Sequence, residues 1–267
     1  MRKMGKLSVI YLVIVFAILY APIFYLMYYS FNSAGTMHSF EEFTFEWYEG
    51  VFHDTRLFII LLNTLVIALL SSAISTIIGI AGALAITRMK TKRFRNTLLT
   101  LNNVMIVSPD VIIGASFLVL FAMIGIRLGF ASVLISHIAF SVPIVVLMVL
   151  PNLEEMSPTL IDAARDLGAS RWDVLTRVII PYISPGIFAG FFMALTYSLD
   201  DFAVTFFVTG SGFTTLSVEI YSLARRGISL TINALSTLIF LVTLVMVIGY
   251  YFISKQGPKL REAEVRE

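Results

Sequence analysis

The stretch SPTLIDAARDLGASRWDVLTRVIIPYISP, residues 157–185, is a polar, helix-forming island between long apolar segments. Ser157 can cap a helix whose first residue is Pro158, because the absent N–H of proline would have no partner at that position. Gly168 can adopt the left-handed conformation that ends many helices. The first half of the island therefore predicts one short helix that stops at Gly168.

A second helix is predicted immediately after Gly168. Ser170 and Asp173 have the spacing of a capping box, with Asp in place of the usual Glu or Gln. Pro181 should end this helix, because proline has no N–H and its ring clashes with the preceding turn. The island thus predicts two short helices joined at Gly168.

The composition is that of an integral membrane protein. Of the 267 residues, 58% are apolar and only 13% are charged, and the mean hydropathy is +0.90. The chain is predicted to be all-α and polytopic, a single domain over residues 1–267 with six transmembrane helices that each cross a ~30 Å hydrocarbon core. The predicted spans are about 7–31, 59–87, 98–125, 131–150, 185–208 and 230–253. The first is longer than a signal-peptide core and lacks a clear cleavage site, so it is expected to be retained.

The distribution of basic residues predicts the orientation of these spans. Most of the 19 Lys and Arg residues lie on one face, in the N-terminus, the 88–95 loop, the 151–184 loop and the tail after residue 253. The exceptions are Arg56, Arg127, Arg225 and Arg226. By the positive-inside rule the basic face is cytosolic, which places both termini and the helical island in the cytosol. There the island can be presented to a partner.

Several kinds of chemistry are not expected. The chain has no cysteine, so disulfides and thiolate metal sites are excluded, and the three histidines, His38, His53 and His137, have no metal-ligand spacing. The net charge of +2 indicates no nucleic-acid surface. His137 alone lies within a predicted span, where we expect it to pack or to form hydrogen bonds. We predict no catalytic residue and no metal site.

Small residues recur at intervals of four in two of the predicted spans. Such stripes let helix backbones approach closely within lipid, so they predict tight helix packing. The stripes are Ser75, Gly79 and Ala83 in the second span, and Gly186, Gly190 and Ala194 in the fifth.

Three carboxylates lie inside predicted spans: Asp110 in the third, and Asp200 and Asp201 in the fifth. Each costs roughly 2.5–3.5 kcal/mol on insertion scales, which implies a protein-lined or wet environment. At a rise of ~1.5 Å per residue, Asp110 lies roughly 18 Å and Asp200 roughly 22 Å from the cytosolic ends of their spans. The similar depths allow a common cavity.

The sequence allows two interpretations of Asp110 but favours one for Asp200 and Asp201. Asp110 follows Ser108-Pro109, so it is either a cap for a helix broken by the proline or part of a pathway. No helix breaker adjoins Asp200 and Asp201, and no Lys or Arg lies in the neighbouring spans, which favours a functional role.

Successive helical residues point about 100° apart, so at most one of this aspartate pair can face a pore and the other must bond a neighbour. Tyr197 lies on the same helix face and can stack on, or hydrogen-bond, a cationic ligand. The residues Asp110, Tyr197, Asp200 and Asp201 together predict a cation pathway.

The cytosolic island resembles the EAA loop of binding-protein-dependent ABC importer permeases, whose pattern is Glu-Ala-Ala, three residues, Gly, nine residues, then Ile-x-Leu-Pro. The matching residues are Asp162-Ala163-Ala164, Gly168 and Val178-Ile179-Ile180-Pro181. The resemblance implies a MetI-like fold, and a loop helix that fits a groove on an ATPase subunit and transmits its closure to the membrane helices. It assigns ATPase coupling to Asp162, Ala163, Ala164, Gly168 and Pro181.

Over nearly its whole length the chain further resembles the spermidine/putrescine branch of that family, especially the second of its two permease subunits. The residues that carry this resemblance are Ser108-Pro109-Asp110-Val111-Ile112-Ile113-Gly114 and Leu199-Asp200-Asp201-Phe202-Ala203. It implies a subunit that moves polyamines across the cell membrane by alternating access. The implied partners are a cytosolic ABC ATPase dimer, a second homologous permease and an extracytoplasmic polyamine-binding protein. The chain has no Walker-type phosphate loop, so ATP and Mg are expected on the separate ATPase and no cofactor on this chain.

Three alternatives remain at this stage. An importer of this family for another solute, such as a different organic cation or ferric ion, shares the EAA loop. An intramembrane aspartyl protease also places aspartates on two spans, but those enzymes resemble Tyr-Asp and Gly-x-Gly-Asp, whereas this chain has Pro109-Asp110 and Ser198-Leu199-Asp200. A passive channel would conduct without ATP.

Overall fold

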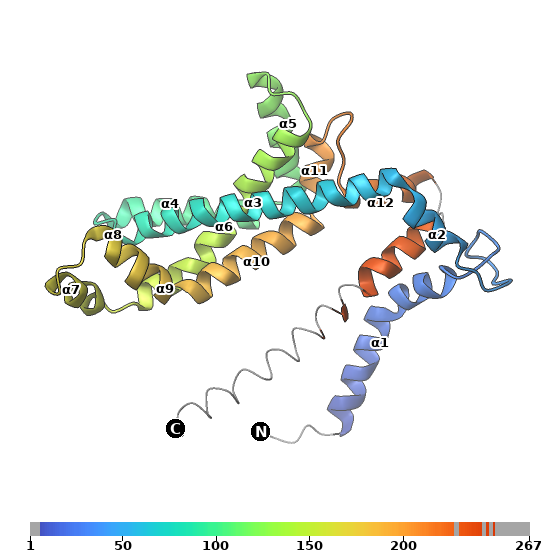
Figure 1. The fold of residues 1–267 in the computed structure, drawn as a ribbon, viewed down its shortest axis with the longest axis horizontal. Helices are drawn as coiled ribbons and strands as arrows, with labels where there is room; N and C mark the ends of the chain where they lie inside the picture. Colours follow the sequence, from blue (N-terminus) through green and yellow to red (C-terminus); the bar gives the residue numbers. More distant parts are fainter. Residues whose placement is uncertain (1–5, 227–229, 242–243, 246–247, 249–267) are drawn as a thin grey trace. The chain divides into compact units, whose positions relative to one another are not determined.

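The computed structural model describes residues 6–226, 230–241, 244, 245 and 248, and these residues are almost entirely helical (Figure 1). They belong to two compact units, one formed by residues 59–219 and the other by residues 1–58 together with 220–267. The expectation of one membrane domain over the whole chain stays a prediction.

The unit of residues 59–219 contains the cytosolic island and the three membrane aspartates. Its elements in chain order are most of α3 (Thr55–Thr87), α4 (Lys92–Val107), α5 (Asp110–Ile124), α6 (Phe130–Glu155), α7 (Pro158–Asp166), α8 (Arg171–Asp173), the π-helical η1 (Val174–Ile179), α9 (Ile180–Tyr182), α10 (Ser184–Asp200), α11 (Ala203–Val208) and the start of α12 (Leu216–Arg226). In Figure 1, α3, α6 and α10 run alongside one another, and α7 to α9 lie at one end of this group.

α3 and α6 are continuous helices long and apolar enough to cross a membrane. α6 runs five residues beyond the predicted span 131–150 and passes through Pro151. Leu153 is buried in the hydrophobic core of this unit, as is Met156 just past the helix end, and Glu154 forms an ion pair with Arg95 of α4. These contacts outside the apolar span explain why α6 continues where hydropathy alone ends it.

The third predicted span, 98–125, is not one helix. α4 and α5 are bent by 105° at Ser108-Pro109. Pro109 restricts the residue before it to extended conformations, and Ser108 accordingly has φ −67° and ψ 138°. The span is thus broken at the proline, as one of the two interpretations of Ser108-Pro109-Asp110 expected, and the proline is the local cause.

The fifth predicted span, 185–208, is also broken. α10 ends at Asp200, Asp201 is extended with φ −63° and ψ 121°, and α11 begins at Ala203. The carboxylate of Asp201 accepts hydrogen bonds from the backbone N–H groups of Val204 and Thr205. No proline or glycine adjoins this break, and the side chain of Asp201 instead starts the new helix through these hydrogen bonds.

The two stripes of small residues pack against α6, as predicted. An ideal Cβ built on Gly79 of α3 would lie 2.5 Å from Val145 Cγ1, and one on Gly186 of α10 would lie 2.5 Å from Asn152 Nδ2 and 2.8 Å from the carbonyl oxygen of Met148. The other stripe residues, Ser75, Ala83, Gly190 and Ala194, are also buried. Close backbone approach therefore packs both α3 and α10 against α6.

The Gly79→Ala substitution is expected to destabilise the assembled protein by about 1–3 kcal/mol, because the new Cβ would overpack a helix contact. The clash includes Val145 Cβ at 2.6 Å, which no side-chain rotation relieves. Gly82→Ala on the same helix is the matched control, since its Cβ would meet Val146 Cγ2 at an ordinary 3.5 Å. The thermal unfolding midpoint of the detergent-purified protein measures the difference, and equal midpoints for the two variants would contradict the packing argument.

The other unit contains both chain ends. α1 (Lys6–Tyr29) covers all but the last two residues of the predicted span 7–31, and a short apolar helix over residues 230–241 covers the start of the predicted span 230–253. The Tyr20 and Phe240 rings of these helices make an edge contact, with centroids 6.4 Å apart. α2 (Glu46–His53) follows α1. The end of the sixth predicted span and the basic tail lie outside the described residues.

Candidate functional site

The two helix breaks in the unit of residues 59–219 lie next to each other. The Tyr197 hydroxyl of α10 donates a hydrogen bond to Asp110 Oδ1 at the start of α5, with the oxygens 2.5 Å apart. An ideal Cβ on Gly114 would lie 2.9 Å from Val204 Cα, so α5 and α11 pack almost backbone to backbone. The fold therefore brings all four predicted pathway residues, including Asp200 and Asp201 at the end of α10, into one region.

Asp110 is half-buried and is the first residue of α5. The capping position is Pro109, which has no side-chain cap, so Asp110 does not act as the helix cap that one interpretation proposed. The positive end of the α5 dipole and the Tyr197 hydroxyl both stabilise the charge of Asp110. This carboxylate is thus partly compensated within the protein.

Asp201 is 8% exposed, and its carboxylate is occupied by the start of α11. Oδ1 accepts from the Val204 N–H at 3.2 Å, and Oδ2 accepts from the Thr205 N–H at 2.8 Å and the Thr205 hydroxyl at 2.7 Å. Three donors on one short helix leave little capacity for a ligand. Asp201 is the member of the pair that bonds its neighbours.

Asp200 is the exposed member of the pair. It ends α10, and its carboxylate has no hydrogen bond or ion pair with the part of the chain that the structure describes. The C-terminal end of a helix carries partial negative charge, so it adds to the field of Asp200 instead of offsetting it. Chemically, this is a place where a passing cation would be attracted.

The cytosolic island has the two-helix form that its sequence predicts. α7 begins at Pro158, and Gly168 has a φ of +84° in the left-handed region. On α7, Asp162 and Ala163 are exposed and Ala164 is half-buried against the core. The exposed face of α7 therefore carries small and charged side chains together with Leu160, which is 45% exposed, and it is open to a partner.

The second helix of the island begins with the predicted capping box. The Ser170 hydroxyl oxygen accepts from the Asp173 N–H at 3.2 Å, and Asp173 Oδ2 accepts from the Ser170 N–H at 3.3 Å. The helix ends at Tyr182, one residue after Pro181, and then bends by 68° into α10. The prediction that Pro181 ends this helix is confirmed to within a residue.

The hydrogen bond from the Ser170 hydroxyl, with help from the Ser170 N–H and the charge of Arg177, lowers the pKa of the Asp173 carboxyl. A lowered pKa in the folded loop stabilises the helix start above the ordinary Asp pKa of ~3.9, and the contribution is lost as the pH falls through the lowered value. Ser170→Ala should therefore reduce amide-exchange protection of residues 171–176 at pH 7.

The difference in protection between Ser170→Ala and the parent should shrink as the pH falls below about 4, since the parent then loses the same carboxylate bond. Ser157→Ala is the control, because the Ser157 hydroxyl bonds only the Thr159 hydroxyl and caps no backbone group. Equal protection in Ser170→Ala and the parent at pH 7 would show that the capping box does not hold this helix.

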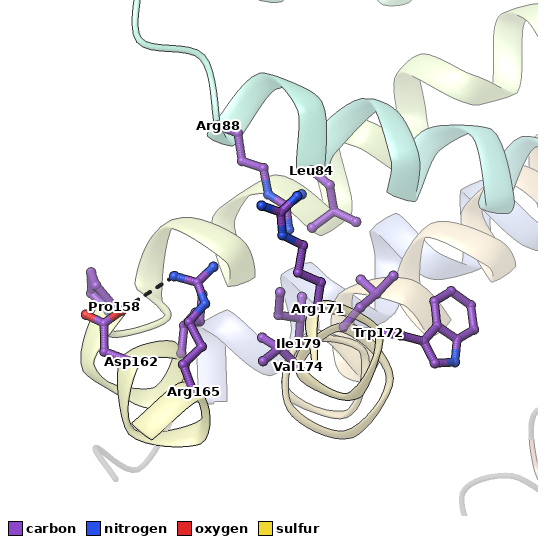
Figure 2. Close-up of a pocket in the computed structure, with 11 residues that line it drawn as sticks. Leu84, Arg88, Pro158, Asp162, Arg165, Arg171, Trp172, Val174 and Ile179 are labelled. Carbon is purple, nitrogen blue, oxygen red and sulfur yellow. Dashed lines mark ion pairs between the residues drawn. The ribbon is translucent and has the colours of Figure 1, made fainter. Parts of the chain in front are cut away.

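A pocket of about 770 Å³ opens between the cytosolic end of α3 and the island (Figure 2). Arg88, Arg165 and Arg171 line it, with apolar side chains such as Leu84 and Ile179 at its base. Arg165 pairs with Asp162 at 3.8 Å, whereas Arg88 and Arg171 make no ion pair with any described residue. This pocket is a basic hollow beside α7, and it suits acidic side chains of a docking protein. Sequence analysis missed it because Arg88 is distant from the island along the chain.

The apolar helices indicate a membrane protein, and two of them are broken, as in transport proteins that bind a solute within the membrane. Over residues 75–258 the chain matches the family described as "Binding-protein-dependent transport system inner membrane component", and it belongs to that family. It is thus a multi-pass membrane protein and a transport subunit of an ABC importer, not an enzyme; in such systems the ATPase is a separate subunit.

Within the family, the chain is similar to polyamine permeases. It is 36% identical over 254 residues to the spermidine/putrescine transport system permease protein PotC of Escherichia coli (strain K12), covering 94% of this chain and 95% of that protein. It is 31% identical over 264 residues to the putrescine transport system permease protein PotI of the same strain, covering 96% and 94%.

Solved structures confirm the MetI-like fold. The chain superposes on one chain of a bacterial ABC transporter that imports the acidic polysaccharide alginate, with a TM-score of 0.72, 20% identity, and 93% and 94% of the two chains covered. It also superposes on a chain of the inward-facing MetNI methionine ABC transporter, with a TM-score of 0.59, 20% identity, and 74% and 95% covered. At these identities the likeness concerns the fold alone.

Proposed function

We propose that this chain is the permease subunit of an ATP-driven importer that translocates polyamines such as spermidine and putrescine across the cytoplasmic membrane. The observation that carries the proposal is the exposed, uncompensated carboxylate of Asp200 beside the Asp110–Tyr197 pair. A polycationic substrate needs carboxylates within reach along its path, and helix breaks inside a membrane are common places for such sites. The similarity to PotC and PotI supports the same substrate class.

The proposed site holds its substrate weakly. Asp200 attracts one ammonium group, and Asp110 contributes a second carboxylate whose charge is already shared with Tyr197. The Tyr197 ring is held by an edge contact with Phe140, with centroids 4.9 Å apart, and can lie against a cation. Weak, successive contacts let an ion enter and also leave, which a pathway requires.

Transport is proposed to occur by alternating access driven from the cytosol. ATP and Mg bind to a partner ATPase dimer, and its closure moves α7. Ala164 and Ile161 of the island pack on the core that contains Ile179 and Ile183, so motion of α7 reaches the start of α10. α10 has 17 residues and is therefore roughly 25 Å long, which connects the cytosolic bend directly to Asp200.

The proposed assembly contains three kinds of partner besides the lipid bilayer. The exposed face of α7 and the basic pocket beside it suit the ATPase, as charge and shape suggest. A second, homologous permease completes the pathway, and an extracytoplasmic binding protein delivers the polyamine. No contact with nucleic acid is proposed.

Reconstitution of the chain with its co-purifying subunits tests this function. We expect ATP hydrolysis and uptake to require the binding protein and to rise with spermidine or putrescine, with competition between the two. Stimulation by another organic cation or by ferric ion in place of polyamines would instead assign a different cargo. Flux without ATP would identify a channel, and peptide cleavage by the chain alone would identify a protease.

A further inference from the structure

A buried histidine joins the two sides of the α10–α11 break. His137 of α6 is fully buried, and its Nδ1 atom lies 2.7 Å from the Ser198 hydroxyl oxygen near the end of α10. Its Nε2 atom lies 2.8 Å from the Thr205 hydroxyl oxygen near the start of α11. One imidazole therefore bonds both helices, with Asp201 and Phe202 between them in the chain.

The direction of these hydrogen bonds follows from counting protons. The Thr205 hydroxyl donates its only proton to Asp201 Oδ2 at 2.7 Å, so toward His137 it can only accept. His137 therefore donates from Nε2 to the Thr205 hydroxyl oxygen, and the same nitrogen lies 3.5 Å from Asp201 Oδ2. The Ser198 hydroxyl also lies within hydrogen-bond distance of the Ser71 hydroxyl of α3, at 3.0 Å.

The chain of bonds consequently runs in two arms from the imidazole of His137. One arm passes through Ser198 to Ser71 on α3, and the other passes through Thr205 to the carboxylate of Asp201. All of these side chains are buried, with exposures of 8% or less. Removing one member would leave its buried polar partners with one hydrogen bond fewer, which destabilises the arrangement.

The side chain of Asp201 starts α11, but the local sequence alone does not favour this cap over a continuous helix. The apolar stretch 185–208 has no proline or glycine near Asp200, and hydropathy predicts one continuous helix through it. If that helix formed, the backbone N–H groups of Val204 and Thr205 would bond carbonyl oxygens one turn earlier and release the carboxylate of Asp201. Asp200 would then lie within a continuous helix instead of at the end of α10.

We infer that His137 is a positioning residue for transport: it holds the α10–α11 break open, keeps Asp201 in the cap of α11 and so presents Asp200 to the pathway. The inference rests on the proposed function for its effect on uptake, but its geometric part does not. Asp201 and His137 act through Asp200, which is the group that meets the cation.

Thiol labelling in the complete transporter tests the geometry without reference to the cargo. The chain has no cysteine, so Asp200→Cys gives a single reporter at the break. Thr205→Val removes one arm of the network with little change of shape, and Ser198→Ala removes the other. Each is expected to change the labelling rate of Asp200→Cys by a cationic thiosulfonate reagent about tenfold, the size that corresponds to one lost buried hydrogen bond.

Two controls separate this effect from general damage. Thr209→Val removes a hydroxyl bond to the Phe213 carbonyl at the other end of α11 and should leave the rate unchanged. A reporter at the exposed Thr196, one turn before the break, should be labelled at the same rate in all backgrounds. Unchanged labelling of Asp200→Cys in both Thr205→Val and Ser198→Ala would overturn the inference, whatever happens to uptake.

Uptake measured on the cysteine-free transporter supplies the second readout. With Asp200 present, Thr205→Val should raise the half-saturating polyamine concentration about tenfold while the basal ATPase rate stays near that of the parent. His137→Gln keeps a donor toward Thr205 and should retain more uptake than His137→Leu. A changed labelling rate with normal uptake would leave the positioning geometry standing and contradict the proposed pathway.

Discussion

Asp200→Asn is expected to raise the polyamine concentration for half-maximal uptake by about tenfold to a hundredfold, the size of a lost interaction between a charged group and its partner. Asp200 is exposed at the negative end of α10, and its carboxylate has no hydrogen-bond partner among the residues that the structure describes. Neutralisation therefore removes attraction for an ammonium group without breaking an internal bond. Radiolabelled spermidine uptake in proteoliposomes that contain the complete transporter measures the effect.

Substitutions at the other two aspartates give this prediction its controls. Asp200→Glu keeps the charge and should restore most of the uptake. Asp110→Asn should have a smaller effect, because Tyr197 and the α5 dipole already share that charge. Asp201→Asn keeps a single acceptor oxygen for three donors, so it should reduce the amount of folded protein more than the affinity. Normal uptake in all three Asn variants would rule out the pathway.

The parts of the structure that sequence predicted correctly depend on residues close together in the chain. The left-handed Gly168, the Ser170–Asp173 capping box and the helix end near Pro181 are each decided within about one turn. The tight packing of the small-residue stripes was also predictable, because a four-residue repeat places the small residues on one helix face, whichever helix packs against it. The break at Pro109 belongs with these, since the proline is local, although hydropathy alone passed over it.

The sequence could not predict that Asp200 is the exposed aspartate and Asp201 the one that bonds the start of α11. This difference depends on a break between α10 and α11 that is held by His137, which is 61 residues from Ser198 and 68 from Thr205 along the chain. A lone histidine in an apolar span predicted hydrogen bonding, and that was confirmed, but nothing in the sequence named its partners. The basic pocket combines Arg88 with the island for the same reason: contacts distant in sequence appear only in the fold.

Ala163→Trp is expected to lower uptake by more than about tenfold, because a large side chain would obstruct close docking of α7 on the ATPase. Ala163 is exposed in this chain and has no role in its core, so the variant should reach the membrane in normal amounts. Ala163→Ser, which adds a single oxygen, should retain most of the uptake. The two variants differ in bulk at one position, which isolates the docking effect from loss of folding.

ATP hydrolysis distinguishes failed coupling from a failed pathway. In the Ala163→Trp transporter, stimulation of ATP hydrolysis by the binding protein and polyamine should be lost along with uptake, because α7 no longer follows ATPase closure. In Asp200→Asn, by contrast, stimulation should return at higher polyamine concentration, since only the affinity is reduced. Normal stimulated hydrolysis and uptake with Trp at position 163 would mean that α7 does not contact the ATPase through its alanine face, and would remove the basis for assigning the coupling role to Asp162, Ala163 and Ala164.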